Sequence, residues 1–233
     1  MARSFGIVEK KLEESEFFLT KLEETIDSWP MSEEPQFYLS AFASATRSIT
    51  FTLQASISDI PEFKEWYKKH QELLKASKLA RYFLEARNLS QKVGYYLIGR
   101  GKSYKTGNGE HKMLLFFQHF SDSQLDYIPE EDILTSCKTY FKLLLNLILD
   151  CYKVFGSIID PELFFTYENL MNTNKSIEDF EEQAGYPRGW TNLPDFSIHD
   201  RIELIARNQP KPTIDWIFKS YLGVNRFGEK GSI

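Results

Sequence analysis

Cysteine is scarce in this chain. The two cysteines among its 233 residues, Cys137 and Cys151, lie in one strongly apolar segment. If that segment is a single helix, the two residues are roughly 20 Å apart and cannot form a disulfide. We therefore expect a reduced, cytoplasmic protein whose thiols are small hydrophobic groups rather than nucleophiles.

Long hydrophobic runs are also missing. The longest apolar run, residues 143–149, is interrupted by Asn146, whereas a membrane span needs roughly 20 apolar residues. Residues 1–5 lead into a charged segment that lacks the apolar core of a signal peptide. Both observations predict a protein with no membrane partner.

Motifs for cofactors and metals are absent as well. Gly99-Arg100-Gly101 resembles half of a glycine loop, but neither a dinucleotide-binding pattern nor a P-loop lysine follows it. The four histidines have no zinc-like spacing and no supporting cysteine or carboxylate cluster, although His111 and His119 could approach each other across a hairpin. We expect neither a cofactor nor a metal site.

The charge is divided unevenly along the chain. The net charge of −5 argues against a general nucleic-acid binder, yet residues 61–112 hold 12 basic and 5 acidic side chains. Residues 121–203 hold 6 basic and 16 acidic side chains, among them the acidic group at 178–182, which we interpret as a solvated helix face. The basic block could bind a polyanion, or the two blocks could neutralise each other within the chain or across a dimer.

Hydrophobic periodicity predicts a mainly α protein. Apolar residues recur at helical spacing in segments 4–28, 35–56, 61–92 (bent near Ala76-Ser77) and 129–156. Two β-rich runs flank a Gly-Asn-Gly turn and predict a hairpin at 93–120, which must pack on other elements because a lone hairpin is only marginally stable. We expect a helical bundle in residues 1–156 with this hairpin inserted, and an extension of short helices in residues 157–233.

Segments 37–54 and 62–67, together with Glu85-Ala86-Arg87-Asn88, resemble the HEPN superfamily, and more narrowly its uncharacterised bacterial members. The resemblance implies a bundle of four to five helices that forms a homodimer. Many members are metal-independent ribonucleases in toxin–antitoxin and antiphage systems, while others have lost catalysis and bind nucleotides or partners. The active motif is Arg, four to six residues, then His, and this chain has Lys92 in place of the histidine.

The resemblance assigns roles to the motif residues. Arg87 would stabilise phosphate charge, Asn88 would orient the 2′-hydroxyl, and Lys92 would neutralise the leaving segment. Lysine is a poor general base unless burial lowers its pKa. Alternatively, Arg87 could bond the last carbonyls of its helix.

Four further cations could bind a polyanion: Arg47, Arg100, Lys102 and Lys105. An alternative for Arg47 is an ion pair with Glu85. We predict a HEPN-like protein that binds or cleaves RNA, in stress or antiphage defence. The alternative is a catalytically inactive homodimeric scaffold that binds a protein partner, and a metabolic enzyme also stays open.

Overall fold

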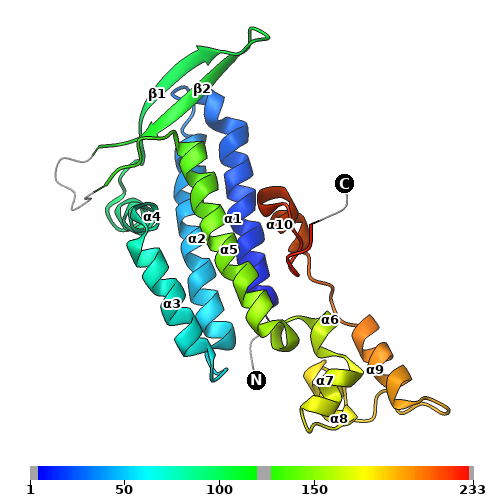
Figure 1. The fold of residues 1–233 in the computed structure, drawn as a ribbon. Helices are drawn as coiled ribbons and strands as arrows, with labels where there is room; N and C mark the ends of the chain where they lie inside the picture. The colour runs from blue at the N-terminus through cyan, green and yellow to red at the C-terminus, as the bar shows by residue number, and fades with distance from the viewer. Residues whose placement is uncertain (1–4, 120–126, 231–233) are drawn as a thin grey trace. The chain divides into compact units, whose positions relative to one another are not determined.

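The computed structural model describes residues 5–119 and 127–230. These residues form ten α-helices and one two-stranded antiparallel sheet (Figure 1), so the prediction of a mainly α fold with an inserted hairpin and a helical C-terminal part is confirmed. The chain divides into two compact units, Met1–Leu147 and Ile148–Ile233. No helix of the described residues is both long and apolar enough to cross a bilayer.

The first unit is a helical bundle. Its helices are α1 (Gly6–Thr25), α2 (Glu34–Ile57), α3 (Phe63–Ala76), α4 (Lys78–Asn88) and the first part of α5 (Ile133–Ile159). α1 buries one side chain per turn against α2, at Val8, Leu12, Leu19 and Leu22. The short 3₁₀ helix η1 (Ile26–Ser28) follows α1.

Ser77 separates α3 from α4. Its backbone is extended (ψ 115°), and its hydroxyl accepts a 3.2 Å hydrogen bond from the Ala80 amide, so it ends one helix and caps the next. The predicted bend near Ala76-Ser77 is therefore a complete break. Because α4 is a separate helix, its direction is independent of α3, and it packs on both α3 and α2.

Aromatic rings from four elements meet in the core of the first unit. Phe83 of α4 stacks on Tyr140 of α5 at 4.5 Å between ring centroids and meets Phe42 of α2 edge-on at 5.9 Å. Phe117, from the hairpin, lies 4.7 Å from Tyr82 of α4. Such offset and edge-on pairs each add about 0.5–1.5 kcal/mol beyond the area they bury. The hairpin is thereby part of the hydrophobic core.

The hairpin consists of β1 (Ile98–Lys105) and β2 (His111–Phe117) joined by a turn at 106–110. The predicted boundaries were partly wrong, because residues 101–105, expected in the loop, belong to β1. Val93, expected in a strand, ends the π-helical turn η2 (Leu89–Val93), which stops at Gly94 with φ +78°.

Two side chains of the bundle, Gln36 and Asp27, hold the hairpin in place by accepting hydrogen bonds from its backbone amides. The Gln36 side-chain oxygen accepts 2.9 Å hydrogen bonds from the amides of Leu97 and Ile98. Asp27 accepts from the Met113 amide at 2.7 Å and pairs with Lys112 at 3.0 Å. The hairpin therefore satisfies the expectation that it needs support from other elements.

The second unit contains the end of α5 and five shorter helices: α6 (Pro161–Phe164), α7 (Tyr167–Asn172), α8 (Ile177–Gln183), α9 (Ile198–Arg207) and α10 (Asp215–Leu222). Phe165 and Phe180 centre a small core with apolar residues of α7, α8 and α9. Ser176 and Ser197 begin α8 and α9 with reciprocal capping boxes. Arg226, only 4% exposed, pairs with Asp160 at 2.6 Å, with Glu162 at 2.5 Å and with Asp215.

Candidate functional site

One face of the hairpin combines cations with aromatic rings. Residues that lie opposite each other in an antiparallel pair point to the same face, and here Arg100 is opposite Phe116, Lys102 opposite Leu114 and Tyr104 opposite Lys112. We call these six residues the basic face. The Arg100 guanidinium lies 5.0 Å from the centroid of the Phe116 ring, a cation–π contact that keeps the charge at the surface.

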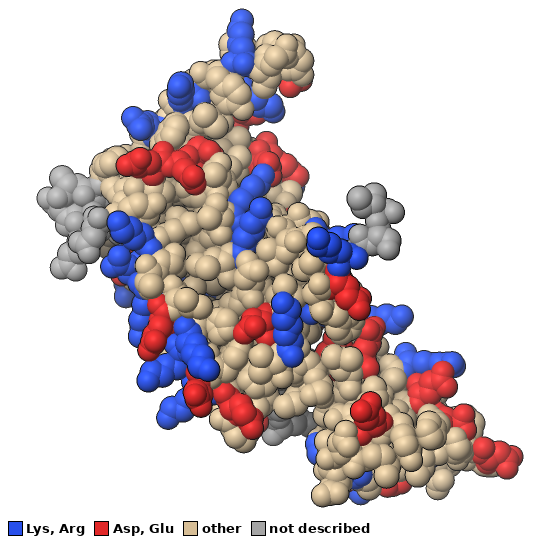
Figure 2. All heavy atoms as spheres, viewed as in Figure 1, with Lys and Arg blue, Asp and Glu red and all other residues tan. Residues whose placement is uncertain are grey.

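The other face of the hairpin packs against the bundle. A β-carbon added at Gly101 would lie 2.8 Å from the Trp29 ring, and Leu115 opposite it is fully buried. Because side chains alternate along a strand, the basic face points away from these contacts. In Figure 2 several Lys and Arg side chains project from the hairpin at the top of the view, and acidic side chains lie below it.

The predicted binding residues of the hairpin do not all lie together. Arg100 and Lys102 share the basic face, whereas Lys105 is opposite His111 and belongs to the other face, close to the turn. Among the described residues, none of these three cations forms an ion pair. Lys112 is different, because its pairing with Asp27 raises its pKa and holds its charge locally.

His111 and His119 do not approach each other across the hairpin, a possibility that the sequence had left open. His111 is the first residue of β2 and His119 lies two residues after its end. The two histidines are therefore at opposite ends of the same strand, not on facing strands. At about 3.3 Å per residue they are roughly 25 Å apart. The His70 ring lies 4.4 Å from the Trp66 ring at a tilt of 52°, and His199 stacks on Tyr167, so each is in an aromatic contact.

The Arg87 motif is only partly assembled. Arg87 donates to the side-chain oxygen of Asn88 at 3.3 Å, and its Nε atom is buried with no hydrogen-bond partner among the described residues. Lys92 is exposed on η2, and within residues 5–119 and 127–230 no hydrogen bond or ion pair joins it to Arg87 or Asn88. The alternative in which Arg87 bonds carbonyls at its helix end is not observed.

Arg47 lies between helices of the bundle. It donates to the Thr50 hydroxyl at 3.2 Å and covers the Phe51 ring at 4.2 Å, and no ion pair with Glu85 occurs in the described part of the chain. Burial raises the pKa of Tyr140 to about 12 and also raises that of Tyr67, while the nearby Arg47 charge opposes both shifts. The Arg47 charge of α2 therefore lies close to the hydroxyl groups of Tyr67 in α3 and Tyr140 in α5.

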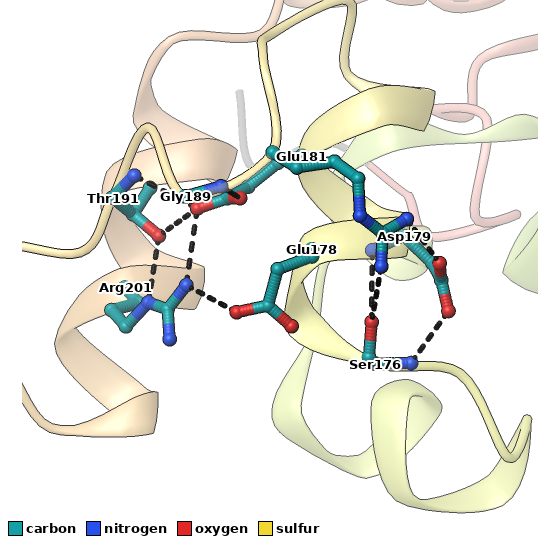
Figure 3. Close-up of polar contacts among 8 residues, drawn as sticks. Ser176, Glu178, Asp179, Glu181, Gly189, Thr191 and Arg201 are labelled. Atoms are coloured by element: carbon teal, nitrogen blue, oxygen red, sulfur yellow. Dashed lines mark hydrogen bonds and ion pairs between the residues drawn. The ribbon is translucent and has the colours of Figure 1, made fainter.

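The acidic group of α8 is a structural clamp (Figure 3). Glu181, expected in a solvated face, is fully buried and accepts hydrogen bonds from the Gly189 amide, the Thr191 amide at 2.8 Å and the Thr191 hydroxyl. Arg201 of α9 reaches Glu181 at 3.2 Å and Glu178 at 2.9 Å. Burial opposes ionisation of Glu181, but these bonds prevail and lower its pKa. The prediction of a solvated face was wrong for Glu181 because its partners are distant in sequence.

Neither cysteine behaves as a reactive group. Both are buried and free, and burial raises the pKa of the Cys137 thiol well above its ordinary value. No group of three or more potential metal-ligating side chains occurs within the described ranges. The basic face of the hairpin is therefore the arrangement best suited to binding.

Residues 6–96 match the family model described as bacteriophage lambda protein ea47. This match covers both helical segments that resemble the HEPN superfamily, so the HEPN assignment was wrong. Amphipathic helices with small residues recur in unrelated bundles, and the motif histidine was already missing. No curated protein and no solved structure matches the chain. The chain is thus similar, from α1 to Tyr96 and over less than half of its length, to a phage lambda protein.

Proposed function

We propose that this protein binds RNA through the basic face of its hairpin, without cleaving it. The observation that carries the proposal is the exposure of Arg100 and Lys102 beside Tyr104 and Phe116, with no ion pair to either cation from any residue that the structure describes. Cations that have no carboxylate partner can exchange their counterions for phosphates, which supplies most of the affinity in such complexes. Aromatic rings beside them offer stacking surfaces for unpaired bases.

The anchoring of the hairpin favours this function. Gln36 and Asp27 hold the two strands from one side, so the basic face is formed before any ligand arrives. A preformed surface loses little conformational entropy on binding. By contrast, no hydrogen bond or ion pair in the described part of the chain joins Lys92 to Arg87 or Asn88, which argues against cleavage by that motif. A role in stress or antiphage defence stays a prediction.

The opposite faces of β1 provide a matched test. Lys102→Gln removes one charge from the basic face, while Lys105→Gln removes the same charge from the other face. We expect Lys102→Gln to weaken binding of a single-stranded RNA several-fold and to reduce the salt slope by about 0.7, as for one lost phosphate contact. Equal effects of the two variants, or no RNA binding by the wild type, would contradict the proposal.

A second candidate function is a scaffold that binds itself or another protein. Two large aromatic side chains of α2, Phe37 and Phe51, are more than half exposed. Between them the helix surface carries small residues that permit close helix approach: Ala41, Ser44 and Ser48. Sedimentation of the wild type and of Phe37→Ser tests this: a dimer lost in the variant supports the scaffold, and a monomeric wild type contradicts a homodimer.

A further inference from the structure

We infer that the groove between α2 and α3 is a separate binding site for a nucleoside phosphate whose base carries an exocyclic amino group. The groove has a volume of about 480 Å³, which is within the usual size range of small-molecule sites. None of the residues that line the groove belongs to the hairpin, so the groove and the basic face are separate surfaces.

Three lysines of α3 line the groove: Lys64, Lys68 and Lys75. Lys64 and Lys68 are one helical turn apart, about 6 Å along the axis, so one phosphate can contact both. Like charges at this spacing repel each other and destabilise the helix slightly. No ion pair relieves them within the described residues, and Glu72 is the one carboxylate in the groove lining. A bound anion would remove this repulsion.

The floor of the groove is aromatic. Phe63 and Tyr67 are stacked with their ring planes at 11° and their centroids 5.2 Å apart, and both line the groove although they are mostly buried. An apolar floor beneath cationic walls suits a ligand with one flat apolar part and one anionic part. A nucleoside phosphate has this division, and inorganic phosphate does not.

Gln54 of α2 supplies a reason for base selectivity. Its side-chain nitrogen donates to the Thr50 carbonyl at 2.9 Å and to the Tyr67 hydroxyl at 3.2 Å. A carbonyl can only accept, so the nitrogen must face Thr50. Gln54 lines the groove, and its side-chain oxygen accepts no hydrogen bond within the described residues. An acceptor at that place favours a base that donates from an amino group, such as adenine or cytosine.

Two sources share this ligand chemistry: a free mononucleotide and an unpaired nucleotide of an RNA strand. Calorimetric titration with AMP, IMP and adenosine tests the site, because IMP replaces the amino group of AMP by a carbonyl. We expect AMP to bind, IMP to bind about tenfold more weakly, as one lost base contact predicts, and adenosine to bind more weakly than AMP. Oligo(A) that binds more tightly than AMP, and loses that added affinity in Lys64→Gln/Lys68→Gln but not in Lys102→Gln, identifies the strand as the source. Similar affinities of oligo(A) and AMP for the groove identify the free nucleotide.

Matched variants locate the site. Lys64→Gln/Lys68→Gln should weaken AMP binding at least tenfold, whereas Lys69→Gln, an exposed position outside the groove lining, should change it less than twofold. Gln54→Leu should remove the preference for AMP over IMP. Lys102→Gln should leave AMP binding unchanged, which separates this inference from the hairpin proposal. Absence of AMP binding, adenosine binding as tight as AMP, or equal effects of the Lys69 and Lys64/Lys68 variants would overturn it.

Discussion

Gly101 of β1 lies directly against the Trp29 ring, and a β-carbon at position 101 would be 2.8 Å from a ring carbon. A strand glycine often marks such a close approach of another group. The Met113 sulfur lies 3.0 Å from the same point, so the space is closed on two sides. The hairpin therefore adopts its position on the bundle because one strand residue has no side chain.

Gly101→Ala should destabilise the protein by about 1–3 kcal/mol, the usual cost of forcing an added group into a filled space. Chemical denaturation measures the change in unfolding free energy. Gly107→Ala, in the turn of the same hairpin, is the control, because no atom lies within 4 Å of its added β-carbon. Equal stability of both variants would show that Trp29 moves aside without cost.

Arg87→Met should leave the unfolding free energy unchanged or raise it by up to about 1 kcal/mol. The buried Nε atom of Arg87 has no hydrogen-bond partner within residues 5–119 and 127–230, so the substitution removes an unsatisfied polar group and keeps an apolar chain of similar length. RNA binding by the basic face should persist. A large loss of RNA binding in a stable variant would instead show that Arg87 contacts the ligand.

Glu181→Gln should destabilise the second unit by about 2–3 kcal/mol, because it removes the buried charge that faces Arg201. Faster hydrogen exchange at the Gly189 and Thr191 amides, both bonded to Glu181, is the local measurement. Glu203→Gln is the control, since its pair with Arg207 is exposed. Unchanged exchange at Gly189 and Thr191 would contradict the clamp.

Acid should weaken the same unit. Hydrogen bonds from Arg201 lower the pKa of Glu178, those from Thr191 and Gly189 lower that of Glu181 against the effect of burial, and bonding to Arg188 lowers the pKa of Asp179 to about 2. A carboxylate with a lowered pKa stabilises the fold above its unfolded pKa and loses that contribution as pH falls. The protection factor of the Thr191 amide, which is its exchange rate relative to that of an unfolded amide at the same pH, should thus fall as the pH drops below about 4.5, the ordinary Glu value. A flat profile would contradict this prediction.

Arg226→Met should cost about 3–5 kcal/mol, since it leaves the buried Asp160 without a counter-charge. Limited tryptic cleavage after Lys219, in α10, reports release of the C-terminal segment. The double variant Asp160→Asn/Arg226→Met removes both charges and should recover part of the loss. If the double variant were as unstable as the sum of the single variants, the pair would not be coupled.

Local patterns predicted most helices, while contacts between distant residues were not predictable. The apolar spacing of 129–156 anticipated α5, and Ala76-Ser77 marked the break before α4. Gly101, however, predicts a loop when the sequence is considered alone, and its role in the strand follows only from the close approach of the Trp29 ring. Lys64 and Gln54 lie on different helices, so no local pattern predicts that they share a groove. The basic block at 61–112 did predict cations on the hairpin and on α3, but not which of them face the same way.

The ring contacts of Phe83 determine how much of the chain must be synthesised before the first unit can fold. Phe83 is covered by Phe42 before it in the chain and by Phe117 and Tyr140 after it. A nascent chain that has emerged only to Tyr96, where the match to the phage protein ends, still exposes that ring cluster. During synthesis, closure of the first unit must therefore wait until about residue 141 has left the ribosome, and premature termination before that point would yield an aggregation-prone fragment.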